Sequence, residues 1–383
     1  MTKRRGHNEG SIKQRADGLW EARVSLPGGK RRSLYGKTRK ETQDKLREAL
    51  RDLDAGLDLS AGRQTVEQFL GQWLSASVRP SVKVKTYEGY ESIVRVRVVP
   101  RLGRVPLARL TPLDLQGLYV GLEEAGLSRR SVHHTHRALH RAFGQAVRWG
   151  LLPRNPCDGA TPPQPKRPEM RVLDQEQVAA LLDATRDHPA HALYVLAITT
   201  GMRIGELLGL RWGDADLGAS KLAVRRALQR QNGAGLVFVE PKTGRSRRSI
   251  VLGQRAVLAL RQHRARQLER RLVAGEAWRD QGLIFCNATG GPADPSWQRA
   301  VFYEALKGAG PPPIRFHDLR HTAATLLLTE GVHPKVVSEM LGHATITLTL
   351  DTYSHLLPVM HAQAAATMDA LFGHPTALAK VLG

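Results

Sequence analysis

The sequence combines arginines, histidines and one tyrosine in a pattern that could support attack on a phosphate ester. Arg203 lies in Thr-Gly-Met-Arg-Ile-Gly-Glu-Leu, His317 and Arg320 lie in Arg-Phe-His-Asp-Leu-Arg-His, and Tyr353 follows His343 by ten residues. Guanidinium groups can donate paired hydrogen bonds to phosphodiester oxygens, on which negative charge builds during displacement. A phenol, with an ordinary pKa near ~10, needs cationic surroundings and a proton acceptor, and histidines can supply these. The set therefore predicts metal-free attack on a DNA phosphate by a tyrosine.

The order and context of these residues resemble the tyrosine recombinase family, also called the phage integrase family. The family pattern has an arginine in Thr-Gly-x-Arg-x-x-Glu-Leu, a lysine in a β-hairpin, His-x-x-Arg, Leu-Gly-His and then the tyrosine. Every element of the pattern occurs here in the same order, within roughly residues 172 to 360. The agreement in order, spacing and flanking sequence makes the resemblance specific.

The resemblance implies that six residues carry out catalysis: Arg203, Lys242, His317, Arg320, His343 and Tyr353. The arginines and the two histidines would bind and polarise the scissile phosphate. Lys242 would protonate the leaving 5′ oxygen, Tyr353 would form a 3′-phosphotyrosine bond, and Glu206 would orient the active-site side chains. No cofactor and no metal ion are expected, because one phosphodiester replaces another and strand exchange then needs no ATP.

Two residues near these motifs also have local interpretations. Lys242 stands between two β-prone runs with a turn signal, which predicts a position at a hairpin tip. His321 follows Arg320 directly, and consecutive side chains on a helix point about 100° apart, so we expect a structural role for His321.

Composition agrees with a nucleic-acid partner. The 383 residues include 57 Lys and Arg against 35 Asp and Glu, for a formal net charge of +22. Such a field attracts polyanions, although basicity alone would equally fit ribosomal, RNA-binding or membrane-surface proteins. Cys157 and Cys286 lack metal-ligand spacing and are typical of reduced thiols. Without an apolar run near ~20 residues, we expect a cytoplasmic protein, associated with the nucleoid of a bacterial host, and no membrane partner.

Residues 1–60 predict a small DNA-binding domain. Apolar Trp20, Ala22, Val24 and Leu26 alternate with polar residues, as in a strand with one buried face, and a helix follows. This three-stranded sheet on a helix is similar to the arm-type DNA-binding domain of many phage integrases. Six cationic residues are predicted to contact DNA, unless they are only solubilising charges: Lys13, Arg15, Arg23, Arg31, Arg32 and Lys37.

Residues 64–152 are predicted to be helical, with capping arrangements at Thr65 and Thr111. The last helix, from about 128 to 149, would gather Arg130, Arg137 and Arg141 on one face, which suits DNA backbone or, alternatively, solvent. By position this segment resembles the helical, SAM-like core-binding domain of the family.

The remaining chain divides into three parts. A proline-rich linker is expected at 153–171, the catalytic domain at 172–373 and a tail at 374–383. The overall fold class is mainly α with small β-sheets (α+β). Met360, Ala364, Met368 and Leu371 form an apolar stripe on a helix from about 358 to 372, which would dock on a neighbouring protomer or pack on its own domain.

The resemblance favours a site-specific recombinase that integrates or excises a phage or mobile element. The expected partners are double-stranded DNA attachment sites, three further copies in a homotetramer on DNA, a directionality factor and a host DNA-bending protein. A type IB topoisomerase and a catalytically inactive DNA-binding accessory or regulatory protein are the alternatives.

Overall fold

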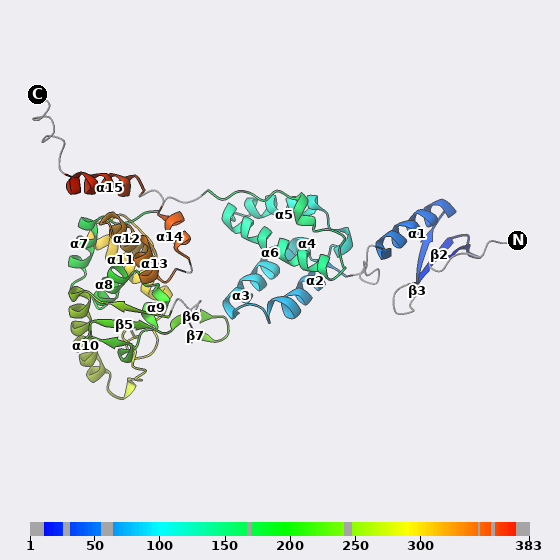
Figure 1. Cartoon of the computed structure of the whole chain (residues 1–383). Coiled ribbons are helices and arrows are strands. Elements are labelled where there is room, and N and C mark those ends of the chain that lie inside the picture. Colours follow the sequence, from blue (N-terminus) through cyan, green and yellow to red (C-terminus); the bar gives the residue numbers. More distant parts are fainter. Residues whose placement is uncertain are drawn as a thin grey trace, which may run out of the picture. The chain divides into compact units, whose positions relative to one another are not determined.

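The computed structural model describes residues 11–25, 31–54, 64–166, 170–240, 247–343, 345–353 and 357–372. The chain forms two compact units, Met1–Pro168 and Glu169–Gly383, shown in Figure 1. The boundary between them falls within the proline-rich segment.

The first unit begins with a three-stranded antiparallel sheet in the order β1-β2-β3. Its strands are β1 (Ser11–Gln14), β2 (Trp20–Ser25) and β3 (Arg31–Gly36), and they are followed by α1 (Arg39–Asp54). Ala22 and Val24 are buried against Leu46 of α1, because alternate residues of β2 point to the same face. The predicted sheet and helix are therefore confirmed, while Leu26 and the second turn lie outside the described residues.

Helices build the rest of the first unit around a core of their own. They are α2 (Val66–Trp73) with η2 (Leu74–Val78), α3 (Val84–Ser92) with η3 (Ile93–Val98), α4 (Val99–Leu102), η4 (Leu107–Arg109), α5 (Pro112–Glu124), α6 (Arg129–Arg148) and η5 (Pro156–Gly159). The predicted caps are confirmed, since Thr65 and Thr111 each accept a hydrogen bond from the third residue of the helix that follows.

The two faces of α6 differ as its sequence predicts. Val132 and Phe143 are buried in the helical core, whereas Arg130, Arg137 and Arg141 are exposed. An apolar stripe at helical spacing thus fixes which side of α6 faces the core.

The second unit is mainly helical and carries two small sheets. Its helices are α7 (Gln175–Ala184), α8 (His191–Thr200), α9 (Ile204–Leu208), η6 (Trp212–Asp214), α10 (Gln254–Ala274), η8 (Gly275–Ala277), α11 (Pro295–Ala309), α12 (Asp318–Thr329), α13 (Pro334–Leu341), α14 (Ile346–Thr352) and α15 (Leu357–Phe372). One sheet has the order β4-β5-β8, from Ala215–Asp216, Lys221–Val224 and Arg248–Val251. The other is the hairpin of β6 (Ala227–Gln231) and β7 (Gly235–Val239).

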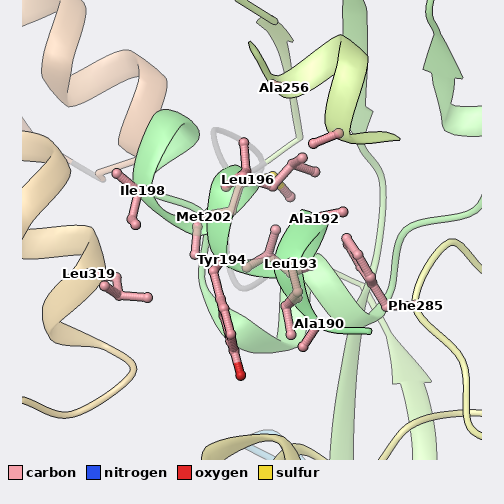
Figure 2. Packing of buried hydrophobic residues seen from close by; sticks show 14 of the residues in the cluster. Ala190, Ala192, Leu193, Tyr194, Leu196, Ile198, Met202, Ala256, Phe285 and Leu319 are labelled. Atoms are coloured by element: carbon pink, nitrogen blue, oxygen red, sulfur yellow. The ribbon is translucent and has the colours of Figure 1, made fainter. Parts of the chain in front are cut away.

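The centre of this unit is α8, which is apolar on all sides and almost wholly buried. Figure 2 shows its side chains projecting in several directions, with Met202, Phe285 and Leu319 beside them. Its capping residue Gly201 has φ +60°, a left-handed conformation that favours glycine. The segment that carries Arg203 therefore leaves a helix that is fixed by packing.

The last helix, α15, agrees with the predicted extent of 358 to 372. Met368 and Leu371 on it are 54% and 70% exposed, and the side chains of Met360 and Ala364 lie outside the description. Among the helices of the described ranges, none is long and apolar enough to cross a membrane.

Candidate active site

The start of α12 presents three of the site's side chains. Asp318 in its first turn accepts hydrogen bonds from the backbone N–H and the guanidinium of Arg315, at 2.8 and 2.7 Å. This arrangement fixes the entry into the helix, as a carboxylate in a first turn does. His317 immediately precedes α12, and Arg320 and His321 follow at positions i+3 and i+4, on one face of the helix.

Arg320 is the buried cation of the site, at 4% exposure. Its Nη1 donates to the carbonyl oxygens of Gly201 and Leu341, at 2.7 and 2.8 Å. Its buried Nη2 has no hydrogen-bond partner among the described residues. Burial and the charge of Arg203 lower the pKa of Arg320 to about 9, although Glu206 raises it. A buried guanidinium with an unused donor would be stabilised by an anion.

Glu206 lies between two further arginines and is itself buried. Its carboxylate accepts from Nη1 of Arg203 and Nη2 of Arg248, both at 2.9 Å, and from the backbone N–H of Arg203 at 3.2 Å. Arg248 also donates from Nε to the Met340 carbonyl oxygen, at 2.7 Å. Burial would raise the pKa of Glu206, but Arg248 and Arg203 hold it below its ordinary value. Glu206 thus stays ionised and fixes the Arg203 side chain.

Tyr353 and His343 come from the two ends of α14. His343 follows Gly342, whose φ of +69° ends α13, and its Nδ1 lies 2.7 Å from Oγ1 of Thr349. Tyr353 directly follows α14 and is 4% exposed. Its hydroxyl lies 3.0 Å from Nδ1 of His321. Its ring packs in a small apolar cluster with Ala324, Leu328, Val337 and Leu341.

The charges of the site favour neutral histidines and a protonated tyrosine in the absence of ligand. Burial raises the pKa of Tyr353 to about 12, while Arg320 opposes this shift. Burial and Arg320 lower the pKa of His343 to about 4. Desolvation and the neighbouring His321 also lower the pKa of His317, although His317 is exposed to solvent. At neutral pH the positive charge of the site therefore resides on its arginines.

The structure brings together five of the six predicted catalytic residues, with Glu206 beside them: Arg203, His317, Arg320, His343 and Tyr353. Lys242 lies outside the described residues. The prediction of a hairpin around Lys242 is wrong in its strand pairing, because β7 pairs with β6 and β8 pairs with β5. The strands that flank Lys242 thus belong to different sheets.

Two residues in the site were not predicted to act there. The expectation that His321 points away is wrong, since its ring reaches the hydroxyl of Tyr353. Its spacing of four from His317 is the signal that places both on one helical face. Arg248 had no such signal, because its partners Glu206 and Met340 are 42 and 92 residues away in sequence.

The basic face of the N-terminal sheet carries a buried carboxylate. Glu21 accepts hydrogen bonds from Oγ of Ser33 at 2.7 Å and Nε of Arg23 at 3.0 Å, and Lys13 lies 3.5 Å away. These contacts lower the pKa of Glu21 to about 2, with Ser33 the largest cause. Glu21 therefore offsets part of the positive charge that the sequence places on this face.

The pairing of β2 with β3 separates two neighbouring arginines. Arg31 is opposite Ser25 and lies on the same face of the sheet as Arg23. Arg32 is opposite Val24 and lies on the other face, which packs against α1. Of the other cations predicted to contact DNA, Arg15 pairs with Asp17 at 3.2 Å, Lys37 is exposed, and Arg141 donates to the Tyr90 hydroxyl at 3.1 Å. The described part of the chain holds no cluster of metal-ligating residues.

Comparison with known families gives two matches. Residues 171–359 match the phage integrase family. Residues 65–122 match the N-terminal SAM-like domain of phage integrases. Together the matches include the helical segment from α2 into α5 and the entire described site.

Individual proteins are similar over most of the chain. The tyrosine recombinase XerC-like protein of Caldanaerobacter subterraneus subsp. tengcongensis is 32% identical, over 89% of this chain and 92% of its own length. An integrase of Streptomyces ambofaciens is 31% identical, over 97% of this chain and 98% of its own. Among solved structures, a Tn1549 transposon integrase in complex with transposon right end DNA matches with a TM-score of 0.68 and 25% identity, over 81% of this chain and all of that one (100%).

A lambda integrase tetramer bound to a Holliday junction matches with a TM-score of 0.56 and 19% identity, over 91% of this chain and 96% of that one, and shows the shared fold. Taken with the geometry of the site, these similarities establish that the chain belongs to the phage integrase family and is a tyrosine-type site-specific recombinase.

Proposed function

We propose that Tyr353 cleaves duplex DNA while Arg203 and Arg320 hold the scissile phosphate. The observation that carries this proposal is the buried guanidinium of Arg320, whose Nη2 has no partner among the described residues. Burial raises the pKa of the Tyr353 phenol, and the charge of Arg320 lies close enough to oppose this rise. A phosphate oxygen at Nη2 would complete the hydrogen bonding of Arg320 and bring phosphorus close to the nucleophile.

The proposed step exchanges one phosphodiester for another. The Tyr353 oxygen bonds to phosphorus, the bond from phosphorus to the 5′ oxygen breaks, and a 3′-phosphotyrosine remains. We assign Lys242 to protonate the departing 5′ oxygen. A 5′ hydroxyl of a partner strand then reverses the step without an external energy source. An arginine that stabilises charge in phosphoryl transfer contributes roughly 10³ to 10⁵ in rate. Arg203 and Arg320 are therefore each expected to be indispensable for measurable cleavage.

The histidines complete the phosphate site in this proposal. His343 is held through Nδ1 by Thr349, which leaves its other ring nitrogen for a phosphate oxygen. His317 stands at the start of α12, where backbone N–H groups favour an anion. Glu206 acts on Arg203 by holding its guanidinium and takes no direct part in the chemistry.

The division of labour along the chain is also part of the proposal. We assign residues 1–60 to an arm-type DNA-binding domain, 64–152 to the core-binding domain, 153–171 to a linker, 172–373 to catalysis and 374–383 to a tail. Separate apolar cores in the sheet, in the helical segment and around α8 support this division, and the helical core also includes Cys157 and Ala160 from the start of the assigned linker. The exposed arginines of α6 and of the sheet would bind DNA backbone, and their contribution would depend on salt.

The proposed substrates are the attachment sites of a phage or other mobile element, bound by a homotetramer. The DNA complex of the transposon integrase and the lambda integrase tetramer on a Holliday junction support this assignment. A directionality factor and a host DNA-bending protein are proposed to act on the same complex in the bacterial nucleoid.

The test is covalent capture of DNA in EDTA. Purified protein would be incubated with nicked DNA taken from beside its own gene, and the products resolved on a denaturing gel. We expect a protein-DNA band with wild type, and with Tyr353→Phe we expect unchanged DNA affinity and no band. A covalent band with Tyr353→Phe contradicts the assignment of the nucleophile. A band whose product never joins two DNA partners indicates topoisomerase activity instead.

A further inference from the structure

The hydroxyl of Tyr353 already has a basic nitrogen beside it. Nδ1 of His321 lies 3.0 Å from the phenol oxygen, and the two ring centroids are 6.0 Å apart. Because Tyr353 is 4% exposed, little water can reach its hydroxyl to receive a proton. A general base must lie within hydrogen-bond reach of the proton it removes, and His321 meets this condition.

The two histidines that the family pattern assigns to phosphate binding are placed differently. Nδ1 of His343 is directed to Oγ1 of Thr349, at 2.7 Å. The ring of His317 meets that of His321 edge to face, with centroids 5.3 Å apart, and His317 is exposed to solvent. Their positions therefore suit contact with DNA, whereas His321 faces the nucleophile.

Charged groups around His321 keep its lone pair available. From α12 and the segment before it, Asp318 raises the pKa of His321, while Arg320 and Arg315 lower it, and burial lowers it most. The rings of His317 and His343 are also near, and each is influenced by His321. The net effect is a pKa below the ordinary value of a histidine. His321 is therefore neutral at neutral pH, and its Nδ1 can accept a hydrogen bond when the proton is on Nε2.

We propose that His321 is the general base that accepts the Tyr353 proton during strand cleavage, an assignment that rests on the proposed function of Tyr353. As the phenol oxygen bonds to phosphorus, its O–H bond breaks and the proton moves to Nδ1 of His321. The electron pair of the breaking phosphorus–oxygen bond leaves with the 5′ oxygen. In the reverse step His321 returns the proton to the phenol oxygen as the phosphotyrosine bond breaks.

The assignment can be tested with His321→Asn, since an asparagine can accept a hydrogen bond near the former Nδ1 position but cannot act as a base of useful strength. We expect adduct formation in a single turnover to slow by ~10² to 10⁴, with unchanged affinity for DNA. His321→Leu should slow it as much. The matched control is His333→Asn, an exposed histidine that caps α13 with its side chain, and it should cleave at the wild-type rate.

A second measurement separates proton transfer from positioning. Fluorinated tyrosine at position 353 has a more acidic phenol, so less help from a base is needed to form the phenolate. If His321 acts as the base, the rate deficit of His321→Asn should shrink at least ~10-fold with the fluorinated residue. A merely structural role predicts the same deficit with both phenols.

Three results would overturn this inference. They are a wild-type rate for His321→Asn, a loss in His321→Leu that His321→Asn restores, and a deficit that is unchanged by fluorination. Failure of the proposed function has a different signature, which is adduct formation by Tyr353→Phe.

Discussion

The buried Glu206 carboxylate allows a quantitative prediction about stability. It pairs with Arg203, whose side chain is 41% exposed, and with Arg248, whose side chain is 7% exposed. The exposed pair contributes at most ~1 kcal/mol, because solvent screens it. Removing one partner of the buried pair costs ~3 to 5 kcal/mol, since a charge is left unpaired in the interior. Glu206→Gln should therefore lower the free energy of unfolding of the second unit by ~3 to 5 kcal/mol, mainly through Arg248.

The partner variant and the double variant refine the prediction. Arg248→Met should cost ~3 kcal/mol, near the lower limit, because Glu206 keeps Arg203 as a partner. In the double variant neither a buried carboxylate nor the Arg248 charge remains. Its loss should be smaller than the sum of the single losses by at least ~2 kcal/mol, as expected for two groups in direct contact.

Hydrogen exchange in increasing urea provides the assay, because it reports each unit separately in the intact chain. Peptides from α8 and α12 report on the second unit, and peptides from α6 serve as an internal control that should not change. The pKa of Glu206 is lowered on folding, so its contribution is complete above its unfolded pKa near ~4.3 and is lost as the pH falls through the folded value. The difference in free energy of unfolding between wild type and Glu206→Gln should therefore become smaller in acid.

A matched substitution in the same unit is Glu240→Gln, which removes an exposed carboxylate 2.6 Å from Arg247. Its effect should stay within ~0.5 kcal/mol. Strictly additive losses in the double variant, or a loss below ~1 kcal/mol for Glu206→Gln, would contradict the argument that the buried pair with Arg248 dominates.

Other consequences can be measured on the same protein. Arg31→Gln should weaken the salt dependence of binding to the DNA site of the N-terminal domain by about one phosphate contact, and it should spare cleavage by the catalytic domain. Arg32→Gln lies on the sheet face toward α1 and should leave this salt dependence unchanged. DNA titrations at several salt concentrations measure both effects. Gly201→Ala should destabilise the second unit by more than ~2 kcal/mol, because a Cβ there would overlap the Leu341 side chain, while Gly310→Ala, with φ +88° and open space, should cost ~1 to 2 kcal/mol in thermal unfolding. The pKa of His343 is lowered to about 4, so its contribution to the free energy of unfolding should be complete above pH ~6.5 and fall by up to ~3 kcal/mol as the pH drops toward 4. His343→Asn should make the free energy of unfolding depend less on pH in the same thermal melts.

The sequence alone determined the features that depend on neighbours a few residues apart. The caps at Thr65 and Thr111 were predictable because a side chain bonds to a backbone N–H three residues away. The two faces of α6 and the alternation along β2 follow from the periods of a helix and a strand. The order of the predicted catalytic motifs was also readable directly, and the match to the phage integrase family covers the segment that contains them.

Only the tertiary structure decided which groups meet within the site. Arg320 donates to carbonyl oxygens 119 and 21 residues away in sequence, and His321 reaches the Tyr353 hydroxyl across 32 residues. Such contacts depend on how helices pack around α8, and local periodicity carries no information about them. The contacts of Arg248 and His321 arise in this way, and the place of Lys242 stays a prediction. The sequence thus specified the chemical groups, and packing selected the partners that set their charges.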